Sequence, residues 1–159
     1  AWVAAGGGLE PGEPGVVPAA DYPGQWDMEQ VVDAGQVMGR LSAPGVWLLD
    51  ARAPARFAGR HEPVDAVAGH VPGARNLPYS SLVSDGRLLP PAQICALAQQ
   101  CLGSTAPADT VLMCGSGVTA CHLLLALEHA GLHGARVFAG SWSGWISDSM
   151  RPVSVAQRQ

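Results

Sequence analysis

The sequence predicts an α/β domain with a mainly parallel central sheet flanked by helices on both faces. Short apolar runs that suit buried strands alternate along the chain with amphipathic stretches of helical length. The two strongest apolar runs, 45–50 and 110–114, end on the polar residues Asp50 and Cys114. In parallel sheets the carboxyl ends of the strands meet at one edge, where reactive groups usually gather. We therefore expect Asp50 and Cys114 to lie at the same edge of the sheet.

The first quarter of the chain divides into a linker and a helix. Residues 1–25 are rich in glycine, proline and alanine and have little apolar period, which predicts a linker. Residues 27–41 are expected to form a helix with Asp27 as its N-cap. A buried strand at 45–50 and a short strand at 72–78 follow.

Predicted helices and strands alternate more regularly in the second half of the chain. Residues 90–103 form a predicted helix that begins at two prolines and ends at Gly103. A strand at 110–114, a helix at 118–131 and a last strand at 135–140 complete the expected sheet. This order of elements is typical of a single α/β domain.

Composition excludes several classes of function. The chain has 159 residues, 48% hydrophobic and 14% charged, which is enough to bury the core of one domain. The net charge of -4 argues against a nucleic-acid partner, and no apolar run approaches the roughly 20 residues of a membrane span. All nine basic residues are arginines. Without lysine, a Walker phosphate loop and a pyridoxal Schiff base are excluded.

The four cysteines indicate neither a metal site nor a disulfide framework. They stand at 95, 101, 114 and 121 without a Cys-x-x-Cys pair or the spacing of a zinc site, so no metal is expected. Cys95 and Cys101 lie in the predicted helix 90–103. We expect no signal peptide and a reduced, cytoplasmic compartment.

A reactive thiol is predicted at Cys114, where "CGSG" joins a strand to a helix. Gly115 and Gly117 allow the backbone to curl around the sulfur, so that successive N–H groups and the helix start face it. Such surroundings stabilise an anion and lower the pKa of a cysteine. The alternative is a buried, inert cysteine at a strand end followed by a glycine turn.

Two other cysteine chemistries fit the sequence poorly. A cysteine phosphatase needs an arginine six residues after the nucleophile, and this chain has Ala120 there. A Cys-His protease needs a histidine base such as His70 or His122. His122 lies on the helix after the loop and is poorly placed to reach back. His70, in "GHVPGA", is expected to be a turn or core histidine.

Four motifs together resemble the rhodanese-like sulfurtransferase family, and within it the 3-mercaptopyruvate sulfurtransferases. These are "LLDARAPARFAG", "GHVPGARNLPYSSL", "CGSGVTACH" and "FAGSWSGW", and the resemblance covers about residues 45–152. It implies a rhodanese-like fold and an enzyme without a cofactor. Cys114 would take sulfane sulfur from a small-molecule donor as a persulfide. It would then pass the sulfur to a thiol acceptor such as thioredoxin, or to cyanide.

The resemblance also implies a domain organisation. The opening "AWVAAGG" resembles the tail of a preceding rhodanese-like domain. We therefore expect 1–25 to be that tail and an interdomain linker, and 26–159 to be the catalytic domain. An N-terminal rhodanese-like domain would then be its partner.

The resemblance further implies the roles of the site residues. Cys114 is the nucleophile, and Ser116 matches the serine that assists sulfur abstraction. The residues expected to bind the substrate are Arg56, Arg60, Gly115, Gly117, Val118 and Thr119. The alternative for Arg56 is a salt bridge within its loop.

The choice of donor stays open at this point. Gly115 and Ser116 are neutral, which favours 3-mercaptopyruvate over the dianion thiosulfate. However, the family's second arginine is replaced by Val64, and whether Arg60 substitutes for it depends on its direction. Thiosulfate sulfurtransfer is the alternative. A non-catalytic interaction module is a third possibility, which the intact Cys114 disfavours.

Overall fold

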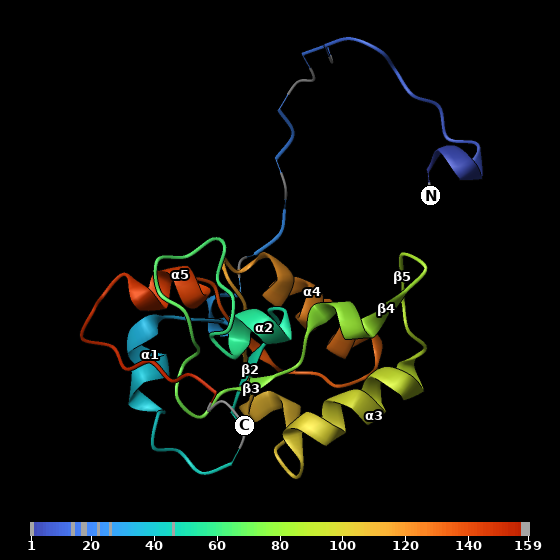
Figure 1. Cartoon of the computed structure of the whole chain (residues 1–159). Coiled ribbons are helices and arrows are strands. Elements are labelled where there is room, and N and C mark those ends of the chain that lie inside the picture. Colours follow the sequence, from blue (N-terminus) through green and yellow to red (C-terminus); the bar gives the residue numbers. More distant parts are fainter. Residues whose placement is uncertain are drawn as a thin grey trace.

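A five-stranded parallel sheet forms the centre of the domain in the computed structural model (Figure 1). The structure describes residues 2–13, 15–16, 19–21, 23–25, 27–45 and 47–156. The strand order is β1-β7-β6-β2-β3, and every neighbouring pair is parallel. The strands are β1 (Val31–Val32), β2 (Leu48–Asp50), β3 (Arg75–Asn76), β6 (Val111–Met113) and β7 (Arg136–Phe138).

Helices cover both faces of this sheet, as predicted. Alternate residues of β2, β6 and β7 point to opposite faces, which divides the core into two apolar clusters. On one face lie α3 (Pro91–Leu102) and α4 (Val118–His129). On the other lie α1 (Ala34–Gly39) and α5 (Ser141–Ile146), whose cluster includes three fully buried tryptophans. These are Trp47, Trp142 and Trp145.

The prediction of one helix over 27–41 is wrong. Residues Met28–Gln30 form a short 3-10 helix (η2), Val31–Val32 form β1 at the sheet edge, and α1 begins only at Ala34. Asp27 caps η2, whereas Asp33 caps α1 through a capping box with Gln36. Two β-branched valines that pair with β7 outweigh the helical period read across them.

The other predicted elements are confirmed, with ends that differ by a few residues. The helices predicted at 90–103 and 118–131 correspond to α3 and α4, and Gly103 follows α3 with a φ of 62°. The strands at 45–50, 72–78, 110–114 and 135–140 shorten to β2, β3, β6 and β7. Of the first of these strands, Val46 lies outside the described residues.

Several short elements were not predicted. They are α2 (Pro54–Phe57), the 3-10 helices η1 (Val3–Ala5), η3 (Tyr79–Leu82) and η4 (Pro107–Asp109), and the hairpin of β4 (Val83–Ser84) and β5 (Arg87–Leu88). The hairpin turns at Asp85-Gly86, both with positive φ, which matches the twist of a two-residue turn. α2 carries Arg56, one of the residues expected to bind the substrate.

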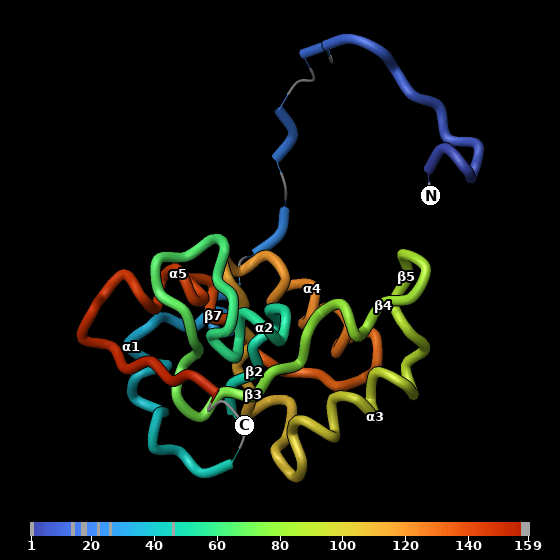
Figure 2. Tube along the Cα trace, in the orientation of Figure 1, coloured from blue at the N-terminus to red at the C-terminus, as the bar shows by residue number. Residues whose placement is uncertain are grey.

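The chain before the domain runs away from it in Figures 1 and 2. No described residue of 2–25 is buried, and Trp2 packs only locally, with its indole N–H donating to Gly8 O at 2.9 Å. Both ends of the predicted domain of 26–159, Trp26 and residues 157–159, lie outside the described residues. Within the described part of the chain, no helix is long and apolar enough to cross a bilayer.

Candidate active site

The loop between β6 and α4 holds Cys114 at the carboxyl edge of the sheet. We call residues 114–119, which include the first two residues of α4, the cysteine loop. Gly117 is the N-cap of α4 and has a φ of 91°, which L-residues rarely adopt. A Cβ atom at Gly117 would also lie 2.6 Å from the carbonyl oxygen of Ala139. Glycine is therefore required at this position both for the turn and for the close approach of the chain after β7.

The cysteine loop surrounds the sulfur with donors. Cys114 is buried, and its Sγ accepts a hydrogen bond from the N–H of Gly117 at 3.1 Å. Burial by itself disfavours the thiolate. The Thr119 hydroxyl, the N–H groups of Ala120 and Ser116, and the Ser141 hydroxyl together outweigh it and lower the pKa of Cys114. The site therefore favours an anionic sulfur.

Ser141, at the start of α5, forms hydrogen bonds that hold the cysteine loop in place. It is fully buried and has a φ of 49°, which is rare for a serine. Its Oγ accepts from the N–H of Cys114 at 3.0 Å. Its one proton can be donated either to Phe138 O at 2.9 Å or to the Cys114 Sγ at 3.9 Å. Sequence reasoning did not identify Ser141, and its only signal was its place in "FAGSWSGW".

The first turn of α5 also holds the backbone of the loop. The N–H of Trp142 donates to Cys114 O at 3.0 Å, and the N–H of Ser143 donates to Gly115 O at 2.9 Å. The Ser143 hydroxyl lies 2.9 Å from the same carbonyl oxygen. Because α5 fixes two consecutive carbonyls, the loop keeps its N–H groups turned toward the sulfur.

Arg56 lies beside the cysteine loop within a group of carboxylates. It belongs to what we call the arginine segment, residues 54–65. Its Nε is 3.0 Å from both oxygens of Glu62, and its Nη2 is 2.7 Å from Glu62 Oε1 and 2.9 Å from Asp65 Oδ2. Burial opposes the charge, but the carboxylates raise the pKa of Arg56. The guanidinium is therefore firmly held and permanently charged.

The guanidinium approaches the loop at Gly115. A Cβ atom at Gly115 would lie 3.4 Å from Nη1 of Arg56 and 3.5 Å from Nη2. Nη1 has no hydrogen-bond partner among the residues that the structure describes. The lack of a side chain at Gly115 thus leaves one face of the guanidinium open next to the residue that follows Cys114.

Other predicted site residues lie at the rim. Ser116 and Val118 are exposed, and the Ser116 hydroxyl makes no hydrogen bond to a described residue. Arg60 is exposed as well, and its guanidinium forms no ion pair within the described ranges. Val64 is 74% exposed. The structure brings together Cys114, the loop glycines, Thr119 and Arg56, but it does not bring Arg60 into the network of Arg56.

Three other polar residues of the sequence motifs contact residues of the surrounding fold. Arg52 is buried, binds Asp50 through Nε and Nη2 at 2.7–3.1 Å, and lies over the ring of Trp142. His70 stacks on Phe57 and its Nδ1 lies 2.8 Å from Phe57 O. His122 packs edge-on against Tyr79, and its buried Nδ1 has no partner within the described part of the chain. None of these three side chains shares a hydrogen bond with Cys114.

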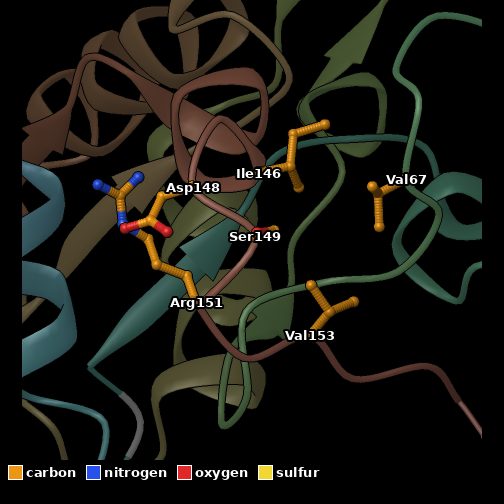
Figure 3. A pocket seen from close by; sticks show the side chains of 6 residues that line it. All are labelled: Val67, Ile146, Asp148, Ser149, Arg151 and Val153. Carbon is orange, nitrogen blue, oxygen red and sulfur yellow. The ribbon is translucent and has the colours of Figure 1, made fainter.

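A small hollow lies apart from the sulfur, between the segment before β3 and the chain after α5 (Figure 3). Its volume is about 150 Å³, and Val67, Ile146 and Val153 form its apolar wall. Asp148 and Arg151 form an ion pair at its edge, with Nε and Oδ2 3.7 Å apart.

Among the described residues, no three His, Cys, Asp or Glu side chains cluster as metal ligands would.

Known proteins resemble this chain over most of its length. The chain is 48% identical to a probable 3-mercaptopyruvate sulfurtransferase of Pseudomonas aeruginosa, covering 97% of this chain and 54% of that protein. It is 42% identical to the putative thiosulfate sulfurtransferase SseB of Mycobacterium tuberculosis, covering 96% and 54%. The solved 3-mercaptopyruvate sulfurtransferase from Leishmania major matches with a TM-score of 0.75 at 32% identity, covering 94% and 42%.

The chain spans about half the length of the curated relatives it matches. The family model described as Rhodanese-like domain matches residues 33–148, which include β2 to α5 and the whole cysteine loop. The parallel sheet with helices on both faces, the cysteine at its carboxyl edge and this match agree, and the chain belongs to the rhodanese-like family.

Proposed function

We propose that this chain is the catalytic domain of a sulfurtransferase that takes sulfur from 3-mercaptopyruvate and passes it to a thiol acceptor or to cyanide. The observation that carries the proposal is the cysteine loop. A buried Cys114 with a lowered pKa faces the N–H of Gly117 at 3.1 Å. Relatives named 3-mercaptopyruvate sulfurtransferase support the donor.

The proposed chemistry has two transfers. The Cys114 thiolate attacks the sulfur of the donor, the new S–S bond forms, and the carbon–sulfur bond breaks. The electron pair of that bond leaves on the donor carbon, which takes a proton to give pyruvate. The persulfide then yields its outer sulfur to an acceptor thiolate or to cyanide, and the Cys114 thiolate is regenerated. A persulfide anion is stabilised by the same N–H donors as the thiolate.

The other site residues have proposed roles around this sulfur. Arg56 binds the donor carboxylate through the open Nη1, beside Gly115. Gly117, Val118 and Thr119 shape the loop, and the exposed Ser116 hydroxyl assists the carbon–sulfur cleavage. Arg60, exposed and without an ion pair to a described residue, is available to the donor from the rim.

Thiosulfate is the second candidate donor. The relative from Mycobacterium tuberculosis, at 42% identity, is named a putative thiosulfate sulfurtransferase. The residues that follow Cys114 are neutral, and Arg56 already faces two carboxylates, so the site offers little positive charge to a dianion. We therefore place thiosulfate second. The lowered pKa of Cys114 argues against a non-catalytic module.

The partners and location are part of the proposal. An N-terminal rhodanese-like domain would complete the site, because this chain matches only about half of each relative. The acceptor would be a small thiol or a protein dithiol of the thioredoxin kind. Four cysteines without disulfides are consistent with a reducing cytoplasm.

Turnover and sulfur loading together test this function. The chain is incubated with 3-mercaptopyruvate and weighed intact, and cyanide is then added and thiocyanate is measured. We expect Cys114 to gain one sulfur atom that cyanide removes. The same assay on a protein that includes the preceding domain should turn over faster, because a cleft between two domains aligns donor and thiolate. A chain that gains no sulfur from either donor would contradict the proposal.

A further inference from the structure

Asp65 joins Arg56 to the helix that supports the cysteine loop. Its Oδ2 accepts from Arg56 Nη2 at 2.9 Å, and its Oδ1 accepts from the Ser143 hydroxyl at 2.7 Å. Its side chain is only 8% exposed. Ser143 in turn contacts Gly115 O, the carbonyl directly after Cys114. A negative charge is thus held close to both the proposed anion receptor and the reactive sulfur.

Glu62 and Asp65 share Arg56 but differ in their other contacts. Glu62 is nearly buried, accepts from the N–H groups of Val64 and Asp65, and lies 3.4 Å from Nη1 of Arg52. Burial opposes its charge, but Arg56 and these N–H groups lower the pKa of Glu62. Glu62 is therefore needed to shape the arginine segment. Asp65 adds a second carboxylate to a guanidinium that already has one, so Arg56 and its two partners carry a net negative charge.

We propose that Asp65 is a specificity-determining residue that makes the site select a donor with one negative charge over a donor with two. This inference rests on the proposed function. Coulomb energy scales with the charge of the ligand, so a carboxylate near Arg56 penalises a dianion about twice as strongly as a monoanion. One open nitrogen, Nη1, suffices for a carboxylate. Thiosulfate, a dianion without a carboxylate, lacks this contact and meets a stronger repulsion.

The alternative is that Asp65 only ties the arginine segment to α5. Three variants separate the effect of the Asp65 charge from the effect of its hydrogen bonds. Asp65→Asn removes the charge and can keep both bonds, because its amide oxygen can accept from Arg56 while its NH₂ donates to Ser143. The Ser143 proton is then free for Gly115 O, 2.9 Å away. Ser143→Ala breaks the tether and keeps the charge, and Asp65→Glu keeps the charge on a longer side chain.

The first measurement needs no turnover. Cys114 in the chain is alkylated with iodoacetate, an anion, and with iodoacetamide, its neutral counterpart, and the ratio of the two rates reports the local potential. Asp65→Asn should raise this ratio about 1.5- to 5-fold, the range expected for removing one charge beside a site that is open to solvent. Ser143→Ala and Asp65→Glu should leave it unchanged. Should Asp65→Asn fail to fold, Asp65→Ser makes the same prediction. An unchanged ratio in a folded neutral variant would overturn the proposal.

The second measurement uses the donors. The rate at which Cys114 gains sulfur is followed by intact mass with thiosulfate and with 3-mercaptopyruvate. In Asp65→Asn the thiosulfate rate should rise about 1.5- to 5-fold relative to the mercaptopyruvate rate. In Ser143→Ala both rates should change together. If loading occurs and Asp65→Asn keeps the wild-type preference, the inference fails while the function stands. If neither donor loads the wild type, the function fails, and the alkylation ratio alone decides the role of Asp65.

Discussion

The cysteine loop and the arginine segment meet at one point but are built in different ways. The loop is a continuous stretch between β6 and α4, and most of the groups that lower the pKa of Cys114 lie within six residues of it. The arginine segment depends on charges: Arg56 is held by Glu62 and Asp65, and Asp65 by Ser143 from the far end of the chain. The loop thus lowers the pKa of Cys114 mainly through groups close to it in the chain, whereas the selection of the donor that we propose for the arginine segment depends on charges brought together by the fold.

Replacing Cys114 should break the function completely and gives the largest expected effect. Cys114→Ser should gain no cyanide-removable sulfur from either donor, because a serine hydroxyl neither ionises near neutral pH nor forms a persulfide. The sulfur gained is measured as the increase in intact mass after incubation with 3-mercaptopyruvate. Cys95→Ser, Cys101→Ser and Cys121→Ser are the controls and should load as the wild type does. Sulfur uptake by Cys114→Ser would show that another residue is the nucleophile.

Removing Arg56 should affect the arginine segment and spare the loop. A charge-assisted hydrogen bond contributes about 1.5–3 kcal/mol, so Arg56→Ala should lose roughly 10- to 150-fold in kcat/KM for 3-mercaptopyruvate. Thiosulfate should lose less, and the iodoacetamide reaction of Cys114 should continue. Arg56→Lys is the matched variant, which restores the charge without the planar fork. An unchanged ratio of the two donors in Arg56→Ala would refute its role as the carboxylate receptor.

Changing Gly117 tests whether the loop depends on its backbone. Gly117→Ala combines a φ of 91° with a contact 2.6 Å from Ala139 O. It should lower the free energy of unfolding by about 2 kcal/mol or more, from the left-handed backbone and the overlap together. Thermal or urea unfolding measures this loss of stability. Gly131→Ala is the control, since Gly131 has a φ of 77° but open space around it, and should cost only about 1 kcal/mol. Equal losses in the two variants would mean that the close approach to Ala139 carries no cost.

Replacing the Thr119 hydroxyl should give the smallest effect, a change in pH dependence. This hydroxyl favours the thiolate, so Thr119→Val should raise the pKa of Cys114. A raised pKa means less thiolate at neutral pH, and iodoacetamide labelling at pH 7 should slow by about three- to tenfold. The rate should approach the wild-type value as the pH rises. Ser116→Ala removes an exposed hydroxyl and should leave the labelling profile in place. A profile that is the same in all three proteins would remove Thr119 from the account of the thiolate.

The cysteine loop was easier to predict from the sequence than the arginine segment, because its residues are contiguous in the chain. A strand end, two glycines and a helix start form one contiguous pattern, so Cys114 and Gly117 were recognisable from residues 110–131 alone. Gly115 was expected, like Gly117, to let the backbone curl around the sulfur, but only Gly117 has a positive φ, and Gly115 instead leaves space for Arg56. The short strand β1 was missed because a two-residue strand at a sheet edge has no period of its own.

The sequence by itself determined the parallel α/β class and the place of Cys114 in a glycine-containing loop between a strand and a helix, because these follow from hydrophobic periods and from local backbone freedom. Only the tertiary structure decided that Ser141 lies beneath Cys114 and that Asp65 connects Arg56 to Ser143. These contacts join residues far apart in the chain, and one involves a serine with a positive φ. Neither the distance between two charges nor a backbone angle imposed by surrounding packing leaves a local pattern in the sequence.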